Sequence, residues 1–283
     1  MGMTRPATLP GAVVAALRCP LCASPFTLDG RSLRCPARHS FDLAKQGYVN
    51  LLHAGIPAGT ADTAEMVAAR VAFLGAGHYG GLRDLVAEVA AGAGGYGLVV
   101  DAGAGTGYYL AGVLDRLPEA AGLALDVSAV ALRRAAKAHD RLGAAVWNLW
   151  EPWPVAAEAA AVVLNVFAPR NAAEFRRVLR PGGTLLVVSP ERGHLGELAA
   201  VAPVLEVDAR KEERLDAALS EHFELVSRRA LRDRVLLKPD DVRNAVRMGP
   251  TGHHPDRLAA LAEVTEPAEV TLAFSVSEYR RTA

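Results

Sequence analysis

Residues 101–107 read Asp-Ala-Gly-Ala-Gly-Thr-Gly, and this stretch decides the fold of the 283-residue chain. It follows the apolar run Leu98-Val99-Val100, which predicts a strand, and it precedes a helical pattern over residues 107–117. A glycine-rich turn between strand and helix lets the backbone turn tightly and lets a ligand approach closely. The glycines are spaced G-x-G-x-G, and Tyr108 stands where a dinucleotide fingerprint has its third glycine. The loop therefore departs from the dinucleotide pattern.

From Gly97 onward, apolar strand-like runs alternate with helical patterns. We expect strands at residues 98–100, 123–125, 144–147, 159–166, 184–188, 223–230 and 269–279. We expect helices at residues 107–117, 128–141 and 172–179. The unbroken apolar run at 159–166 is typical of a strand covered on both faces. This order predicts a doubly wound α/β fold with a mostly parallel, seven-stranded, Rossmann-like sheet, whose ligand lies at the carboxyl ends of the strands.

The acidic residue that opens the loop gives the first family resemblance. Asp-x-Gly-x-Gly-x-Gly resembles the first motif of class I S-adenosylmethionine-dependent methyltransferases. That cofactor carries no pyrophosphate, and the Asp101 carboxylate suits its cationic methionine end, directly or through water. Asp126 ends the second expected strand, where a carboxylate accepts both ribose hydroxyls. The alternatives are a loop cap for Asp101 and an N-terminal cap of the next helix for Asp126.

Two further positions match the same class in order along the chain. Asn148 follows the third expected strand, where these enzymes usually contact adenine, although relatives often carry an acid there. Arg180-Pro181-Gly182-Gly183 matches their Lys/Arg-Pro-Gly-Gly signature and predicts a turn before the fifth strand. The class resemblance implies cofactor contacts from Asp101, Gly103, Gly105, Thr106, Gly107, Asp126 and Asn148.

All three cysteines fall in a second motif, Cys19-x2-Cys22-x12-Cys35-x3-His39. Residues 27–33 between the two pairs read as two short strands around an Asp-Gly turn. Two pairs on short turns, separated by a hairpin, can meet at the corners of a tetrahedron and form a closed, structural Cys3His zinc site. The alternatives are three reduced, buried cysteines with a surface histidine, or one disulfide with a thiol left over, which the odd count disfavours.

Composition adds limits on compartment and partners. The sequence is 51% hydrophobic, enough for a full α/β core, and it has no charge-free apolar run of about 18 residues, so we expect no membrane span. The N-terminus lacks a secretory signal, and with reduced cysteines this predicts a cytoplasmic protein. The zero net charge predicts no polyanionic partner by itself. However, Arg31, Arg34 and Arg38 cluster in the cysteine segment, with Lys45 close by. The alternative is an ordinary solvated surface.

Several longer motifs together resemble the RlmA family over nearly the whole chain. They are the cysteine segment with its continuation to Leu52, Gly77-His78-Tyr79, Asn165-Val166-Phe167-Ala168-Pro169-Arg170-Asn171, and Pro190-x3-His194-Leu195. Enzymes of this family methylate N1 of one guanine in a hairpin of 23S ribosomal RNA. The run at 165–171 is most similar to the TlrB branch, in which the methyl group confers resistance to mycinosylated macrolides such as tylosin.

The RlmA resemblance implies a site, a domain plan and partners. Zinc would be held by Cys19, Cys22, Cys35 and His39, and the cofactor would be contacted by Tyr79, Gly105, Thr106 and His194. The alternative for His194 is that it lies at the start of a helix and has no role in binding. Residues 1–52 would form a zinc-binding RNA-recognition module with a loose leader at 1–16. Residues 53–92 would be a linker and helices, and 93–283 the methyltransferase domain. A homodimer with an RNA cleft lined partly by the zinc modules is also implied.

Catalytic roles follow from the chemistry of guanine N1. Its proton must leave before or during transfer, and Glu151 is the candidate acceptor. Asn165 and the backbone of 167–169 are expected to hold the base edge, which must be extruded or unpaired. Trp150 or Trp153 stacks on adenine or on the target base, or else packs under a proline-rich loop. Two other functions stay open, a small-molecule natural-product methyltransferase and a non-catalytic RNA-binding or ribosome-assembly factor.

Overall fold

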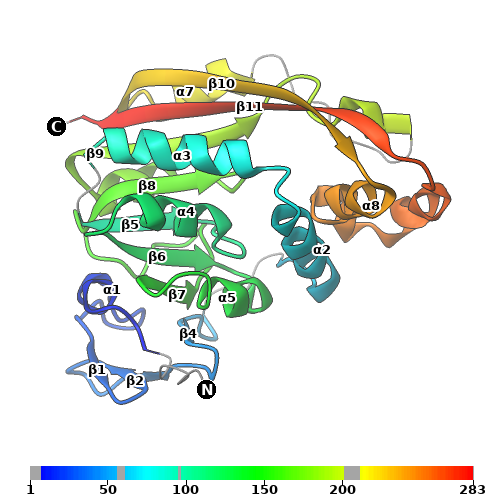
Figure 1. The fold of residues 1–283 in the computed structure, drawn as a ribbon. Helices are drawn as coiled ribbons and strands as arrows, with labels where there is room; N and C mark the ends of the chain where they lie inside the picture. Colours follow the sequence, from blue (N-terminus) through cyan, green and yellow to red (C-terminus); the bar gives the residue numbers. More distant parts are fainter. Residues whose placement is uncertain (1–7, 56–60, 95–96, 201–210, 283) are drawn as a thin grey trace.

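The computed structural model describes residues 8–55, 61–94, 97–200 and 211–282. A large sheet crosses the molecule, helices cover both of its faces, and a small sheet lies at one edge (Figure 1). The small sheet has the order β1 (Thr27–Asp29), β2 (Ser32–Arg34) and β3 (Ser40–Asp42). The hairpin expected within residues 27–33 is thus confirmed, with Gly30 at φ 58° in its turn.

The large sheet has eight strands rather than the seven expected. In spatial order they are β10 (Phe223–Leu237), β11 (Ala268–Arg281), β9 (Leu179–Pro190), β8 (Ala160–Val166), β5 (Leu98–Ala102), β6 (Ala121–Asp126), β7 (Leu142–Val146) and β4 (Tyr48–Asn50). Pairing is parallel from β4 to β9, whereas β11 is antiparallel to both of its neighbours. Every residue of β5 and β8 is buried, as expected for strands covered on both faces.

Helices cover the two faces of this sheet. One face packs against α3 (Gly80–Gly92), α4 (Tyr108–Arg116) and α5 (Ala129–Ala135). The other face packs against α1 (Gly11–Ala16), α6 (Ala172–Val178) and α7 (Lys211–Leu219). Beyond one end of the sheet, α2 (Ala64–Gly75) lies against α8 (Pro239–Arg247) (Figure 1). Short 3-10 helices complete the fold at η1 (Gly196–Ala200), η2 (Pro250–His253) and η3 (Pro255–Glu263).

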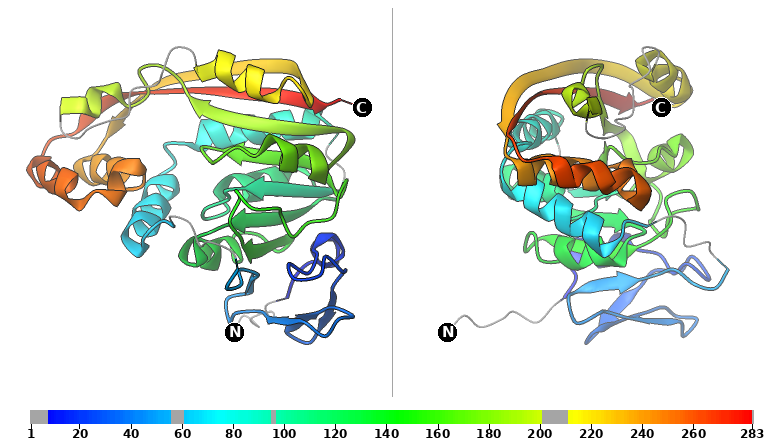
Figure 2. Two further views of the ribbon diagram at one scale, coloured as in Figure 1. Left: turned by 180° about the vertical axis from the view of Figure 1, so that it is seen from behind. Right: turned by 90° about the vertical axis from the view of Figure 1, so that its right-hand side faces the viewer.

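The additional strand comes from the N-terminal segment. Tyr48–Asn50 pair in parallel with Ala144–Val146 of β7, and Val49 is fully buried. The loose leader expected at 1–16 is wrong for residues 11–16, which form α1. The helix can approach β7 because Gly143 has no side chain: a Cβ there would lie 2.9 Å from Val13 Cγ1. Figure 2 shows the N-terminal segment at the β4 edge of the sheet, opposite β10 and β11.

Other departures from the sequence predictions are local. Arg180–Gly183, expected as a turn, form a bulge inside β9: Leu179 pairs with Ala160 and Thr184 with Val162, so four residues face one. Gly182 sits at φ 69° in this bulge. The helix expected at 128–141 ends at Ala135. The linker expected at the start of residues 53–92 includes Pro57 and Gly59, which lie outside the described residues. Within the described chain, no helix has the length and apolar character needed to cross a bilayer.

We predict that Val49→Ala destabilises the whole protein by about 2 kcal/mol, since it opens a cavity between β4 and the sheet. The matched control is Val226→Ala on the edge strand β10, where the side chain is 49% exposed; it should cost well below 1 kcal/mol. Urea unfolding followed by tryptophan fluorescence measures both. Equal effects of the two substitutions would contradict the structural role of β4.

Candidate cofactor pocket and zinc site

The carboxyl ends of β5 and β6 bring the two predicted carboxylates to one edge of the sheet. Asp126 Oδ2 accepts a hydrogen bond from Gly105 N at 2.8 Å, and its Oδ1 accepts one from Ser128 N at 2.8 Å. The N-cap of α5 is Ser128, whose hydroxyl accepts from Ala131 N. Asp126 is therefore not the helix cap; it fixes the glycine-rich loop while keeping lone pairs for a ligand.

Asp101 is buried without a partner. It is 1% exposed, and neither carboxylate oxygen accepts a hydrogen bond from any described residue. The loop-cap alternative is therefore wrong. Burial, and secondly the charge of Asp126, raises the pKa of Asp101 to about 8. A buried carboxyl without a hydrogen bond is costly, so its place is one that a cationic ligand would complete.

The three glycines of the loop have different roles. A Cβ on Gly103 would lie 2.3 Å from Ala168 Cβ, in the loop after β8, and a Cβ on Gly107 would lie 3.1 Å from Ala135 Cα. These two glycines allow close packing of neighbouring segments, at φ 85° and 77°. A Cβ on Gly105 would instead meet the Arg70 guanidinium at 3.3 Å. Gly105 therefore borders the space between the loop and α2.

Tyr79 and His194 come from distant segments and meet here, with 3.0 Å between Tyr79 Oη and His194 Nε2. His194 Nδ1 accepts a hydrogen bond from Ala273 N at 3.2 Å, so in the neutral ring the proton is on Nε2. Nε2–H then donates to Tyr79, which leaves the tyrosine O–H free to donate elsewhere. Burial raises the pKa of Tyr79, so the hydroxyl stays protonated. The 3-10 helix η1 begins at Gly196, so His194 lies two residues before it and is not its first residue.

The sequence reasoning missed two residues of this region, Tyr109 and Arg70, and gave Phe167 a role for its backbone only. The Tyr109 hydroxyl is buried and has no hydrogen-bond partner among the residues that the structure describes, and burial raises its pKa. Arg70 of α2 is ion-paired with Asp62 and donates to Met248 O at 2.8 Å. Phe167 follows β8 and has a ring 6.3 Å from that of Tyr109. Tyr109 could have been identified from the sequence, because it lies directly after the glycine-rich loop. Arg70 could not, because its position depends on contacts with residues far along the chain.

The other predicted residues lie at the same edge of the sheet. Asn148 is buried, and its Oδ1 accepts from Trp150 N at 3.1 Å. Asn165 is fully buried, its Nδ2 donates to Pro169 O at 2.8 Å, and its Oδ1 has no partner in the described chain. Glu151 is half-buried in the turn after Asn148, to whose carbonyl its backbone N–H donates. Thr106 is buried within the loop itself.

The tryptophans have separate environments. Trp153 is 4% exposed, its Nε1 donates to Leu149 O at 3.1 Å, and its ring packs edge-on against Phe175. Trp153 therefore packs under the proline-rich loop, which was the alternative to stacking on a ligand. Trp150 is 65% exposed. Of the two, Trp150 has a ring face available for a ligand.

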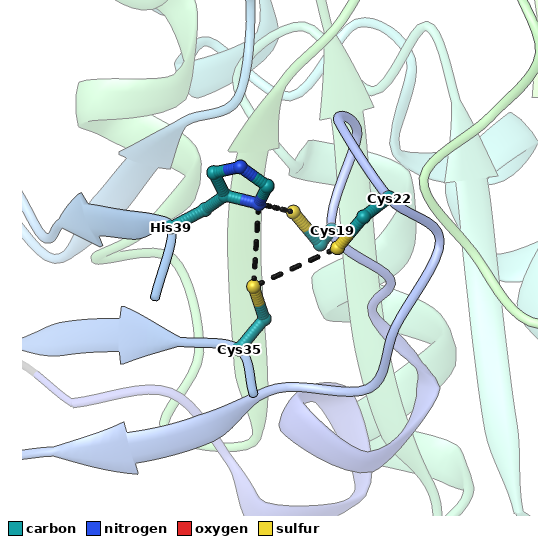
Figure 3. A group of neighbouring side chains, drawn as sticks. All are labelled: Cys19, Cys22, Cys35 and His39. Atoms are coloured by element: carbon teal, nitrogen blue, oxygen red, sulfur yellow. Dashed lines mark hydrogen bonds between the residues drawn. The ribbon is translucent and has the colours of Figure 1, made fainter. Parts of the chain in front are cut away.

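The four predicted zinc ligands converge (Figure 3). Their ligand atoms all lie within 4.8 Å of one another. Cys22 Sγ is 3.7 Å from Cys35 Sγ, and His39 Nδ1 is 3.4 Å from the sulfurs of both Cys19 and Cys35. Tetrahedral Zn²⁺ with bonds of about 2.3 Å places its sulfurs about 3.8 Å apart, so the donor set fits the metal. Four protein ligands leave no open position, which makes this a structural site.

Both pairs of ligands sit on tight turns that the backbone stabilises. Ala23 N donates to Cys19 O at 2.8 Å, and Arg38 N donates to Cys35 O at 2.9 Å. Ala23 and Arg38 adopt left-handed φ values of 57° and 66°, which bend each turn toward the metal position. The thiols of Cys19 and Cys35 are also part of the core that continues into the large sheet.

The mostly parallel sheet, the glycine-rich loop and the zinc site together define a class I S-adenosylmethionine-dependent methyltransferase with an N-terminal zinc ribbon. The family model for the N-terminal region of RlmA matches residues 17–55. A solved structure from Bacillus halodurans, named as a candidate methyltransferase, matches 67% of this chain and 94% of its own, at 16% identity and a TM-score of 0.48.

Two relatives identify the family. A protein of Streptomyces fradiae, named 23S rRNA (guanine(748)-N(1))-methyltransferase, is 48% identical over 95% of this chain and 98% of its own length. A protein of Micromonospora griseorubida, named as a candidate 23S rRNA (guanine-N(1)-)-methyltransferase, is 50% identical over 93% of this chain and 97% of its own. The chain belongs to the 23S rRNA (guanine-N1)-methyltransferase family of the RlmA type.

We predict that Asp101→Asn stabilises the ligand-free protein and weakens cofactor binding. A carboxyl whose pKa rises from 3.8 to about 8 on folding destabilises the fold increasingly as pH rises between those values. The asparagine lacks this penalty, so its melting temperature should exceed that of the wild type more at pH 8 than at pH 6. Loss of a charge-assisted contact should weaken S-adenosylmethionine binding by about 2 kcal/mol, roughly 30-fold. Unchanged affinity in calorimetry would contradict the assignment.

We predict that removing zinc with a chelator, or substituting Cys35→Ser, lowers the melting temperature of the whole chain by several degrees in a single transition. The reason is that Cys19, Cys35 and Leu33 share one core with strands of the large sheet. Differential scanning calorimetry makes the comparison. Two separate transitions, with the main one unmoved, would show that the zinc segment is energetically independent.

Proposed function

We propose that this chain transfers a methyl group from S-adenosylmethionine to N1 of one guanine in a 23S rRNA hairpin. The observation that carries the proposal is the 48% identity, over nearly full length, with a relative named for guanine N1 methylation. The buried, unpartnered Asp101 beside the glycine-rich loop supports a working cofactor site rather than a vestigial one.

S-adenosylmethionine supplies an activated methyl group, and the protein's part is binding and positioning. The proposed contacts use polar groups that can still donate or accept a hydrogen bond. Asp101 takes the methionine ammonium, Asp126 the ribose hydroxyls, and the free O–H of Tyr79 donates to a cofactor acceptor with His194 fixing its orientation. Gly105 and Thr106 line the approach from the loop, and Asn148 reaches the adenine side.

The base side of the site is proposed to use the loop after β8. Because Asn165 donates to Pro169 O, it holds the backbone of residues 167–169 in place, and this backbone would hold the base edge. The N1 proton leaves to Glu151 or to a carbonyl of the loop. A Glu151→Gln enzyme is expected to lose about tenfold in turnover at pH 7; full turnover would remove Glu151 from the mechanism.

The zinc segment is proposed to contact the RNA through Arg38. Arg31 donates to Leu43 O and Ala44 O, and Arg34 pairs with Asp29, so both are engaged within the segment. Arg38 is exposed, and its guanidinium has no partner among the described residues. A free cation on a rigid turn suits a phosphate.

Arg38→Ala is therefore expected to weaken binding of the RNA hairpin severalfold. The slope of log affinity against log salt concentration should become less negative by about one, which corresponds to the loss of one phosphate contact. The control is Arg234→Ala on β10, whose guanidinium pairs with Glu269 at 2.8 Å. Filter binding over a salt series measures both variants. An identical salt slope in Arg38→Ala and wild type would exclude a phosphate contact.

The proposal is tested by methyl transfer from labelled cofactor to 23S rRNA transcripts, with the modified base mapped by primer extension. Methylation at N1 blocks base pairing and stops the extension, so one stop in one hairpin is expected. Cofactor binding without any stop would contradict the proposal and favour a small-molecule substrate or a non-catalytic RNA-binding role.

We further propose that the protein forms a homodimer, which sedimentation would test. We also propose that it confers macrolide resistance, which expression of the wild type and of Asp101→Asn in a susceptible host would test.

A further inference from the structure

The residue that follows β8, Phe167, combines exposure with backbone strain. Its aromatic side chain is 45% exposed, between a buried strand and the glycine-rich loop. Its φ of 54° lies in the left-handed region, which bulky residues rarely adopt and which is found preferentially at functional sites. The neighbouring structure holds it there: Phe167 N donates to Val188 O, and Asn165 anchors Pro169 two residues later.

Ring contacts place Phe167 beside Tyr79 and Tyr109, next to the proposed cofactor-binding residues. Its ring centroid is 5.6 Å from that of Phe274, 6.4 Å from Tyr79 and 6.3 Å from Tyr109. The next residue, Ala168, occupies the space that a side chain on Gly103 would need. Part of the phenyl ring therefore packs against these aromatic side chains, and the rest is exposed to solvent.

We propose that Phe167 is the platform on which the target guanine stacks, an inference that rests on the proposed function. An extruded base loses its stacking partners, and an aromatic ring replaces them. Stacking uses the face of the purine only, so its N1 edge stays free to meet the methyl donor. The left-handed conformation occurs directly after the fully buried strand β8, and the ring of Phe167 is 45% exposed there.

Trp150 is the competing platform because it is more exposed. Within the described chain, however, the ring contacts of Tyr79 include Phe167, Phe73, Phe274 and His194 and do not include Trp150. The base must lie within reach of the transferred methyl group, and Phe167 is the exposed aromatic side chain joined to the pocket by these contacts. Phe167 is therefore favoured over Trp150.

The test compares Phe167→Leu with Phe167→Tyr and with the surface control Leu236→Ala, a residue 66% exposed on β10. Single-turnover methylation of the RNA hairpin, calorimetric affinity for S-adenosylmethionine and melting temperature are measured for each. We expect Phe167→Leu to lose at least tenfold in methylation while cofactor affinity and melting temperature stay close to wild type. Phe167→Tyr, which keeps the ring, should stay within about threefold of wild type, and Leu236→Ala should be unchanged.

Three outcomes would overturn the platform: full methylation by Phe167→Leu, equal loss in Phe167→Leu and Phe167→Tyr, or loss of cofactor affinity in parallel with methylation. If Phe167→Leu unfolds, Phe167→Asn replaces it, because asparagine tolerates the left-handed conformation. Failure of the wild type to methylate the hairpin would instead refute the proposed function itself, so the two failures are distinguishable.

Discussion

The carboxyl edge of the sheet depends on one electrostatic constraint, a buried Asp101 whose carboxylate accepts no hydrogen bond from the described residues. Asp126 lies close enough to raise its pKa further, whereas Asp126 itself is held by two backbone N–H groups. A protein selected for stability alone would replace such a residue. Under the proposed function, the cationic end of S-adenosylmethionine satisfies Asp101. The glycine-rich loop beside it packs against Ala168 of the loop after β8.

A second constraint links the zinc segment to that pocket. The metal site holds the turns around β1–β3, while α1 and β4, on either side of it in the chain, pack onto β7 of the large sheet. Zinc coordination therefore supports the sheet as well as the small ribbon. An open pocket of about 710 Å³ lies between the Cys19–Ala23 turn on one side and Trp147 with residues 152–157 on the other. The segment proposed to read RNA is fixed relative to the catalytic edge rather than tethered to it.

What the sequence allowed us to predict was mainly local. The zinc ligands, the strand–loop–helix around Gly105 and the position of Asp126 are encoded by short spacings, and the structure confirms their arrangement. Tyr79 and His194 could be paired only through family resemblance, because 115 residues separate them. The pairing of β4 could not be foreseen, since a three-residue strand carries no periodicity and its partner lies far along the chain.

The strain at Phe167 and the place of Arg70 likewise depend on tertiary contacts. Phe167 N donates to Val188 O, and Arg70 donates to Met248 O, so each position depends on a residue far along the chain. The most direct test of the whole account is a crystal structure with S-adenosylmethionine bound. We expect the methionine ammonium within about 3 Å of an Asp101 carboxylate oxygen, with the ribose hydroxyls on Asp126. A cofactor bound elsewhere, or an Asp101 that still lacks a polar partner, would contradict it.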